Sequence, residues 1–179
     1  GERGGGAGMI VIQTAIDHRA MTTLARVSRK TLRRGRSGPV RTLAWFVVAL
    51  EAFLTVSYLR GGFGGWLPNT LMGLFMLGCL LLEDRINGAF LLRRIEPERR
   101  TVNVTFSDES TYVCRTQSGE SRWLYSQIRL IAETEEYFVL LHSRSQGQAY
   151  SKSGLSWGTP EELRALLERK TGLKIQRVR

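Results

Sequence analysis

Two long apolar runs occupy the middle of the chain. The first covers residues 42–59 with one charge in 18 residues, and the second covers residues 63–82 with no charge in 20 residues. At about 1.5 Å per residue, helices of these lengths approach or match the hydrocarbon core of a bilayer, which is about 30 Å thick. The pattern predicts a hairpin of two transmembrane helices, 42–59 and 63–82, joined by a short extracytoplasmic loop at 60–62.

Two other interpretations of these runs are weaker. In a soluble protein both would be buried helices, and a chain of 179 residues is too short to cover them. A cleaved signal peptide would need a shorter charged region and a small-residue cleavage site, and a second apolar run follows instead. We therefore expect an integral membrane protein.

Upstream of the runs, residues 9–41 predict a strand and a basic amphipathic helix. Residues 10–16 alternate like a short strand, and Asp17 can cap a helix that extends from His18 to about Arg34. Its apolar or small residues recur at spacings of three and four, namely Met21, Leu24, Ala25, Ser28 and Leu32. Two interpretations stay open: a helix lying on an anionic membrane surface, or a helix packed on the C-terminal domain with its basic face in water.

Residues 88–179 change to short alternating segments separated by turn residues, which is typical of antiparallel strands. Strands are predicted at residues 89–95, 101–106, 111–116, 121–124, 129–133, 137–142 and 148–152. A helix over 160–170 follows, with Thr159 as its N-cap and Glu162 closing a capping box. The predicted fold class is an α+β membrane protein: a transmembrane hairpin, an N-terminal basic amphipathic helix, and a C-terminal antiparallel β, pleckstrin-homology (PH)-like domain closed by one helix.

Positive charge flanks the apolar runs. The net charge is +10, and residues 1–41 hold nine Lys or Arg against two Asp or Glu, whereas residues 42–84 hold one against three. The basic residues nearest the first run are Arg26, Arg29, Lys30, Arg33, Arg34, Arg36 and Arg41. The predicted loop holds only Arg60, so the positive-inside rule predicts that both termini face the cytoplasm. The basic flanks then indicate an anionic lipid leaflet, and not nucleic acid, as their partner.

Glu51 is the residue of the first run that membrane burial does not favour. A carboxylate near the middle of a bilayer costs about 2.5–3.5 kcal/mol on an insertion scale, so it should be protonated or meet a partner. Gly73 lies at the same depth in the antiparallel second run and leaves room for it, and Thr70 is a candidate hydrogen-bond partner. Either Glu51 joins hairpins or carries a proton, or it is a tolerated protonated side chain. Interfacial aromatic anchors are predicted at Trp45, Tyr58 and Trp66.

Candidate chemistry is sparse. The sequence has no nucleotide-binding glycine loop, no zinc-spaced Cys and His cluster and no nucleophile elbow, so we predict no catalytic residue, cofactor or metal site. Cys79 and Cys114 lack the spacing of a disulfide framework, and nothing further supports a dyad of Cys114 with His142. Residues 1–8 are glycine-rich without an initiator methionine, so we expect a tag remnant or a mis-extended start.

The stretches 104–141 and 149–170 share a pattern of aromatic, acidic and basic positions with a known family. The positions that carry it are Phe106, Asp108, Tyr125, Ser126, Ile128, Glu135, Tyr137, Phe138 and Lys152. Together with the basic arm and the paired runs, they resemble the YcxB-like proteins, which are small bacterial membrane proteins. The resemblance implies two spans, a C-terminal PH-like domain and a bacterial cytoplasmic membrane location, and it implies no established reaction.

Two functions of different classes are expected. The first is a non-enzymatic, membrane-anchored interaction or regulatory module whose cytoplasmic domain binds a protein partner of unknown identity. The second is an oligomeric transport or channel component in which several hairpins assemble around Glu51. A homo-oligomer is required by the second function and is compatible with the first.

Overall fold

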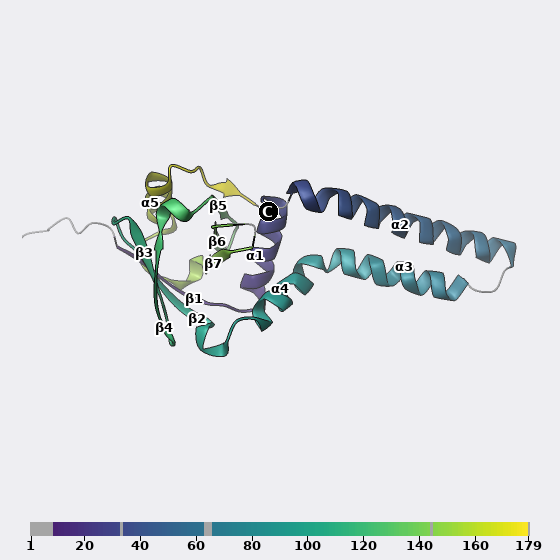
Figure 1. Cartoon of the computed structure of the whole chain (residues 1–179), viewed down its shortest axis with the longest axis horizontal. Helices are drawn as coiled ribbons and strands as arrows, with labels where there is room; N and C mark the ends of the chain where they lie inside the picture. The colour runs from purple at the N-terminus through teal and green to yellow at the C-terminus, as the bar shows by residue number, and fades with distance from the viewer. Residues whose placement is uncertain (1–8, 33, 63–65, 144, 179) are drawn as a thin grey trace, which may run out of the picture.

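The computed structural model describes residues 9–32, 34–62, 66–143 and 145–178, with the backbone alone at residues 34–37. Its architecture is α+β, as the sequence predicts. A β domain lies at one end, and two long helices project from it side by side (Figure 1). The predicted start at residues 1–8, the basic residue Arg33 and the first three residues of the second predicted span, 63–65, lie outside the described residues.

The first sheet has five strands in the order β4-β3-β2-β1-β8. Their bounds are Ile10–Ala15 for β1, Thr101–Phe106 for β2, Thr111–Thr116 for β3, Gly119–Leu124 for β4 and Leu155–Trp157 for β8. The neighbours β1 and β2 are antiparallel, with Ile12 opposite Val104. Because β1 and β2 are adjacent, the helices that separate them in the chain form an insertion between two paired strands.

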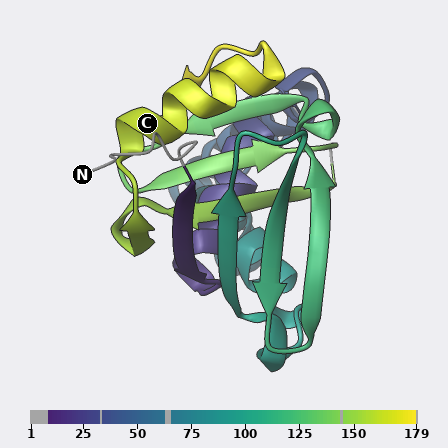
Figure 2. The ribbon, with the colours of Figure 1, turned by 90° about the vertical axis from the view of Figure 1, so that its left-hand side faces the viewer.

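The second sheet has four strands in the order β7-β6-β5-β9. Their bounds are Leu130–Glu133 for β5, Tyr137–Leu141 for β6, Gly147–Ser151 for β7 and Gln176–Arg177 for β9, which pairs parallel to β5. Figure 2 shows its strands crossing those of the first sheet, with α5 (Pro160–Thr171) lying over one end of both. Thr159 and Glu162 form the predicted capping box of α5, and Gly172 ends it at φ 68°.

The helix α1 (His18–Lys30) runs across the base of the projecting helices (Figure 1). The Asp17 carboxylate accepts from the Ala20 N–H at 2.8 Å, which confirms the predicted cap. Its apolar side chains pack against β6 and β7 in a core of their own: Ala20, Met21, Leu24 and Val27 with Val139, Leu141 and Ala149. Of the two interpretations of this helix, the structure shows the one in which its apolar face packs on the β domain.

The projecting helices are α2 (Arg34–Gly61) and α3 (Trp66–Leu81). The segment Gly38–Gly61 of α2 has 24 residues and contains an 18-residue stretch with a mean hydropathy of 1.7, none of it buried, so it could cross a membrane by length and composition. The 16 residues of α3 reach that criterion only together with α4 (Glu83–Arg93), to which α3 is joined at a bend of 66°. One span candidate is therefore continuous, and the second is broken.

The strand predicted at residues 89–95 is wrong, because residues 89–93 belong to helix α4 and residues 94 and 95 form the turn after it. Glu83 and Asp84 lie in the first turn and Arg93 in the last, which suits the dipole of a helix. Gly88 lets α4 approach α1 closely, since a Cβ there would lie 2.7 Å from the backbone nitrogen of Thr22. A short apolar run fits either a strand or a buried helix face, and packing against α1 decides for the helix.

Candidate functional site

The base of the hairpin of α2 and α3 is a cluster of opposite charges. Arg29 of α1 donates to both carboxylate oxygens of Asp84, with Nε–Oδ1 2.8 Å and Nη2–Oδ2 2.7 Å. Arg41 of α2 pairs with Glu83, and Arg26 lies 3.9 Å from Asp84. The hydrogen bond from Arg29 to Asp84 raises the pKa of the guanidinium. Three predicted membrane-surface cations are thus brought together by two carboxylates.

The carboxylates of Glu83 and Asp84 were missed as site residues, because in the sequence they only end the second apolar run. An antiparallel hairpin returns its second helix beside the start of its first, so an acidic pair at that end faces the basic flank. Of the other predicted basic residues, Lys30 ends α1, and Arg34 and Arg36 lie in the first turn of α2, where only the backbone is described.

A second collection of charges lines an open groove of about 1140 Å³ between the N-terminal half of α1 and the turn that joins β5 to β6. We call it the basic groove. Its charged lining residues are Arg19, Arg26, Arg85, Lys152, Arg177, Glu133, Glu135 and Glu136. Arg19 pairs with Glu136 at 2.6 Å, whereas Arg85 and Arg177 make no ion pair with any residue that the structure describes. The groove therefore carries excess positive charge beside the hairpin base.

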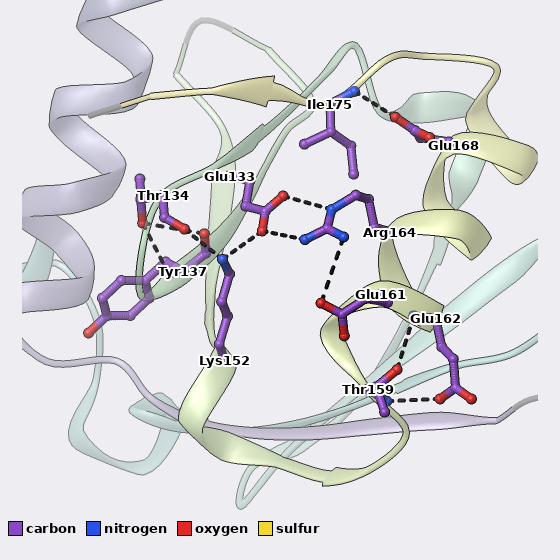
Figure 3. A network of polar contacts seen from close by, with 10 residues as sticks. All are labelled: Glu133, Thr134, Tyr137, Lys152, Thr159, Glu161, Glu162, Arg164, Glu168 and Ile175. Atoms are coloured by element: carbon purple, nitrogen blue, oxygen red, sulfur yellow. Dashed lines mark hydrogen bonds and ion pairs between the residues drawn. The ribbon is translucent and has the colours of Figure 1, made fainter.

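Glu133 lies at one wall of the basic groove and is 6% exposed. Lys152 donates to its Oε1 at 2.6 Å, and Arg164 of α5 donates to both oxygens at 2.8 and 3.0 Å (Figure 3). Lys152 also donates to the carbonyl of Thr134 at 2.7 Å. The hydrogen bonds from Arg164 and Lys152 lower the pKa of Glu133 to about 2. This carboxylate ties β5 to α5 and to the segment after β7, and it is not free to act as a base.

The interior of the β domain holds a buried polar cluster. The hydroxyls of Tyr112 and Tyr150 both donate to Oε1 of Gln148, at 2.8 and 2.5 Å. His142 Nε2 lies 3.1 Å from the Tyr112 hydroxyl, and Cys114 Sγ lies 3.4 Å from the Tyr150 hydroxyl. Burial raises the pKa of the Cys114 thiol and lowers that of His142. The thiol and the imidazole thus contact different tyrosines. Burial of Cys114 also disfavours the thiolate form, which a nucleophilic cysteine needs.

Within the hairpin, Glu51 packs against Gly73 as predicted. A Cβ added at Gly73 would lie 3.2 Å from Cβ of Glu51. The predicted hydrogen bond from Thr70 to Glu51 is wrong, because the Thr70 hydroxyl lies 2.8 Å from the carbonyl of Trp66 and 3.2 Å from the hydroxyl of Thr55. A threonine in a helix commonly donates to the carbonyl four residues earlier. Oε2 of Glu51 is buried without a hydrogen-bond partner among the described residues.

The predicted interfacial aromatics lie at both ends of the hairpin. Trp45 lies in α2 one turn after Arg41, toward the base, and is 43% exposed. Tyr58 lies near the end of α2, and Trp66 begins α3 and is 40% exposed, so both lie toward the tip. Their role as interfacial anchors stays a prediction.

No group of three or more metal-ligating side chains occurs in the described part of the chain. No family model matches the chain, and comparisons with curated proteins and with solved structures give no match. The resemblance to the YcxB-like family stays a prediction.

Proposed function

We propose that this protein is a non-enzymatic, membrane-anchored interaction module whose hairpin lies in the bacterial cytoplasmic membrane. The observation that carries the proposal is the apolar surface of the hairpin. Large apolar side chains are exposed along both helices: Leu43, Phe46, Leu50, Phe53, Val56, Leu59, Leu67, Leu71, Leu74 and Phe75. Water-soluble proteins rarely expose a continuous apolar surface of this extent, whereas lipid tails cover it at no cost.

The proposed orientation has the β domain and both termini on the cytoplasmic side. Arg26, Arg29 and Arg41 gather at the base of the hairpin, and Arg60 is the basic residue near its tip. The positive-inside rule favours a cytoplasmic location for the end of the hairpin with more Lys and Arg. Acidic residues contribute little to that rule. The excess positive charge of the basic groove, beside the base, supports the same orientation because it would meet anionic headgroups.

We infer that the β domain is PH-like. The strands β1 to β4 form one antiparallel meander, β5 to β7 form a second, and α5 covers one end of both. This order of elements fits a PH-like barrel in which the hairpin is inserted between the first two strands. The inference agrees with the resemblance to YcxB-like proteins.

For the protein partner we propose docking along β4, the edge of the first sheet. Its six residues are exposed or partly exposed, and one side of the strand pairs only with β3. An uncovered edge offers backbone donors and acceptors to a further strand. A photo-crosslinking residue at Ser121 should therefore give a defined adduct in cells, and the same residue at Glu161 of α5 should not. Equal or absent adducts at both positions would exclude β4 as the docking edge.

The membrane placement is tested by topology mapping. In a Cys79→Ser, Cys114→Ser background, single cysteines are placed at Arg60 near the hairpin tip and at Glu98 in the β domain. A membrane-impermeant maleimide should label the tip cysteine in intact spheroplasts and the domain cysteine only after permeabilisation. Extraction of the protein by alkaline carbonate, or the reverse labelling pattern, would contradict the proposal.

A second candidate is an oligomeric transport or channel component that uses Glu51. It is favoured by Oε2 of Glu51, which is buried without a hydrogen-bond partner among the described residues, because a carboxylate in such a place can carry a proton. The packing of Glu51 against Gly73 of the same hairpin favours a role within one hairpin instead. Chemical crosslinking in membranes distinguishes the two: a stable homo-oligomer that is lost in Glu51→Leu supports the second candidate, and a monomer removes it.

A further inference from the structure

A second cavity lies on the other side of α1 from the basic groove, between α1 and α4 on one flank and β3, β4 and β7 on the other. Its volume is about 840 Å³, within the range of about 300–1,000 Å³ typical of small-molecule sites. The α1 residues that line it, among them Leu24, Ala25 and Ser28, differ from those that line the basic groove. We call it the α4 cavity.

One wall of the α4 cavity is apolar. It includes Leu91 of α4, Ile95 just after α4 and Leu24 of α1. All three belong to or pack on the core that α1 shares with β6 and β7. Phe90, on α4, is 59% exposed and also lines the cavity. An apolar wall of this kind favours a ligand with an aliphatic body, because burying it removes apolar surface of both molecules from water.

The strand wall of the cavity contains an unsatisfied donor. Trp123 of β4 lines the cavity, and its Nε1 is buried without a hydrogen-bond partner among the residues described. Its ring stacks on His142 with a centroid separation of 4.9 Å, so the indole is held in place. A buried donor without an acceptor costs free energy, so Trp123 marks a polar position in the cavity wall that the described residues leave unpaired.

The rim of the cavity on the α4 side is basic. Arg94 makes no ion pair with the described residues, and Arg99 contacts only the exposed Glu96, at 3.4 Å. Arg29 and Glu83 also line the cavity, but both are engaged in the charge cluster at the hairpin base. The charge left over at the rim is therefore positive, which complements an anionic headgroup.

We propose that the α4 cavity binds an anionic amphiphile, of which one aliphatic chain and the carboxylate or phosphate headgroup enter the cavity. The chain packs on the apolar wall, and the anionic end is held at the basic rim by Arg94. The ligand is either a free acid or a lipid from the adjoining leaflet, because α4 directly follows α3 and Arg94 of the rim directly follows α4. Only the second source depends on the proposed membrane placement.

The test uses the full chain in micelles of a neutral detergent. Trp45→Phe, Trp66→Phe and Trp157→Phe leave Trp123 as the one tryptophan, and bromine quenches the fluorescence of a nearby indole. A terminally brominated undecanoate should quench Trp123 saturably, with a half-saturation concentration about fivefold below that of the matching bromo-alcohol. Quenching that never saturates, or equal half-saturation for the acid and the alcohol, would overturn the proposal.

Variants locate the site. Arg94→Gln should raise the half-saturation concentration of the acid about fivefold. Ala25→Leu, which fills the cavity from α1, should weaken binding of acid and alcohol alike. The matched controls are Arg93→Gln and Thr23→Leu, because neither residue lines the α4 cavity. A loss of binding in the controls equal to that in Arg94→Gln and Ala25→Leu would also reject the site.

Bilayer nanodiscs separate the two ligand sources. Quenching of Trp123 by a phosphatidylglycerol with brominated chains, in discs without free acid, identifies a lipid from the leaflet as the ligand. Quenching only by added bromoundecanoate identifies a free acid. Absence of quenching in both arms, after a positive topology experiment, would reject the α4 cavity while leaving the membrane placement intact.

Discussion

At the scale of single residues, Glu133 shows how a nearly buried carboxylate is held in its charged form. Two cations from different elements donate to it, so the desolvation that burial imposes is offset by charge-assisted hydrogen bonds. In the sequence, Lys152 is one of the positions that resemble the YcxB-like family, but the sequence does not indicate that Glu133 is its partner. Glu133 and Lys152 are 19 positions apart, and Glu133 and Arg164 are 31 apart, so only the packing of α5 on the sheet brings the three together.

Glu133→Gln should lower the stability of the β domain by about 1–3 kcal/mol at neutral pH, because it leaves Lys152 and Arg164 without their shared anion. The folded-state pKa of Glu133, about 2, lies below the unfolded value, so its contribution is complete above the unfolded pKa and is lost as pH falls toward about 2. Thermal unfolding of the full chain in micelles at pH 7 and pH 3 should show a smaller pH effect in the variant.

The control for this experiment is Glu161→Gln. Glu161 is 73% exposed and lies 3.9 Å from Arg164, so its removal should change stability by less than about 0.5 kcal/mol. If both variants show the same melting temperature and pH dependence, the Glu133 cluster does not stabilise the domain.

At the scale of elements, the sequence predicted those whose periodicity and end signals agree. The strands β2 and β3 have the predicted bounds, and α1 and α5 begin at the predicted residues because Asp17 and Thr159 supply side-chain caps. The last turn of each helix is less determined by sequence. The end of α1 came four residues earlier than predicted, where the Thr31 hydroxyl donates to the carbonyl of Val27.

Elements without local signals were missed. The three-residue strand β8 and the two-residue strand β9 are too short for a periodic pattern, and each exists because a longer strand offers it an edge. Helix α4 was predicted as a strand because its apolar residues were considered without their partner α1.

The crossing of α1 and α4 gives a prediction at this scale. Gly88→Ala should destabilise the protein by about 1–3 kcal/mol, since a Cβ would lie 2.7–2.8 Å from atoms of Thr22 and force the helices apart. The same change at Gly78 of α3, where nothing lies within 4 Å, should be neutral or stabilising by up to about 1 kcal/mol. Thermal unfolding monitored by circular dichroism measures both variants. Equal effects would show that α1 and α4 do not pack as described.

At the scale of the whole molecule, the charge cluster joins the hairpin to the β domain. Asp84 at the start of α4 binds Arg29 of α1, and Glu83 binds Arg41 of α2, so three helices meet at two carboxylates. The side chains of Arg29 and Asp84 are only 20% and 18% exposed, which reduces screening by solvent. The cluster is expected to fix the direction in which the hairpin leaves the domain.

Asp84→Asn should therefore lower stability by about 1–3 kcal/mol and increase hydrogen–deuterium exchange in α4. The exposed pair of Glu96 and Arg99 provides the control, because Glu96→Gln should leave both quantities unchanged within error. Restoration of slow exchange by the double variant Arg29→Asp, Asp84→Arg would confirm the pair. Fast exchange already present in the unchanged protein would contradict the role of the cluster.

By itself, the sequence determined the elements whose signals are local: the apolar lengths of the hairpin, the alternation of the strands, the side-chain caps and the uneven charge. These follow from hydrophobic burial and from hydrogen bonds within a few residues. Tertiary structure alone decided what depends on distant pairings. Pairing of β1 with β2 made the hairpin an insertion in the β domain, packing turned residues 83–93 into a helix, and folding brought Asp84 to Arg29 and Arg164 to Glu133. Such contacts depend on which surfaces of the folded elements pack together, and the positions of the residues in the sequence do not indicate this.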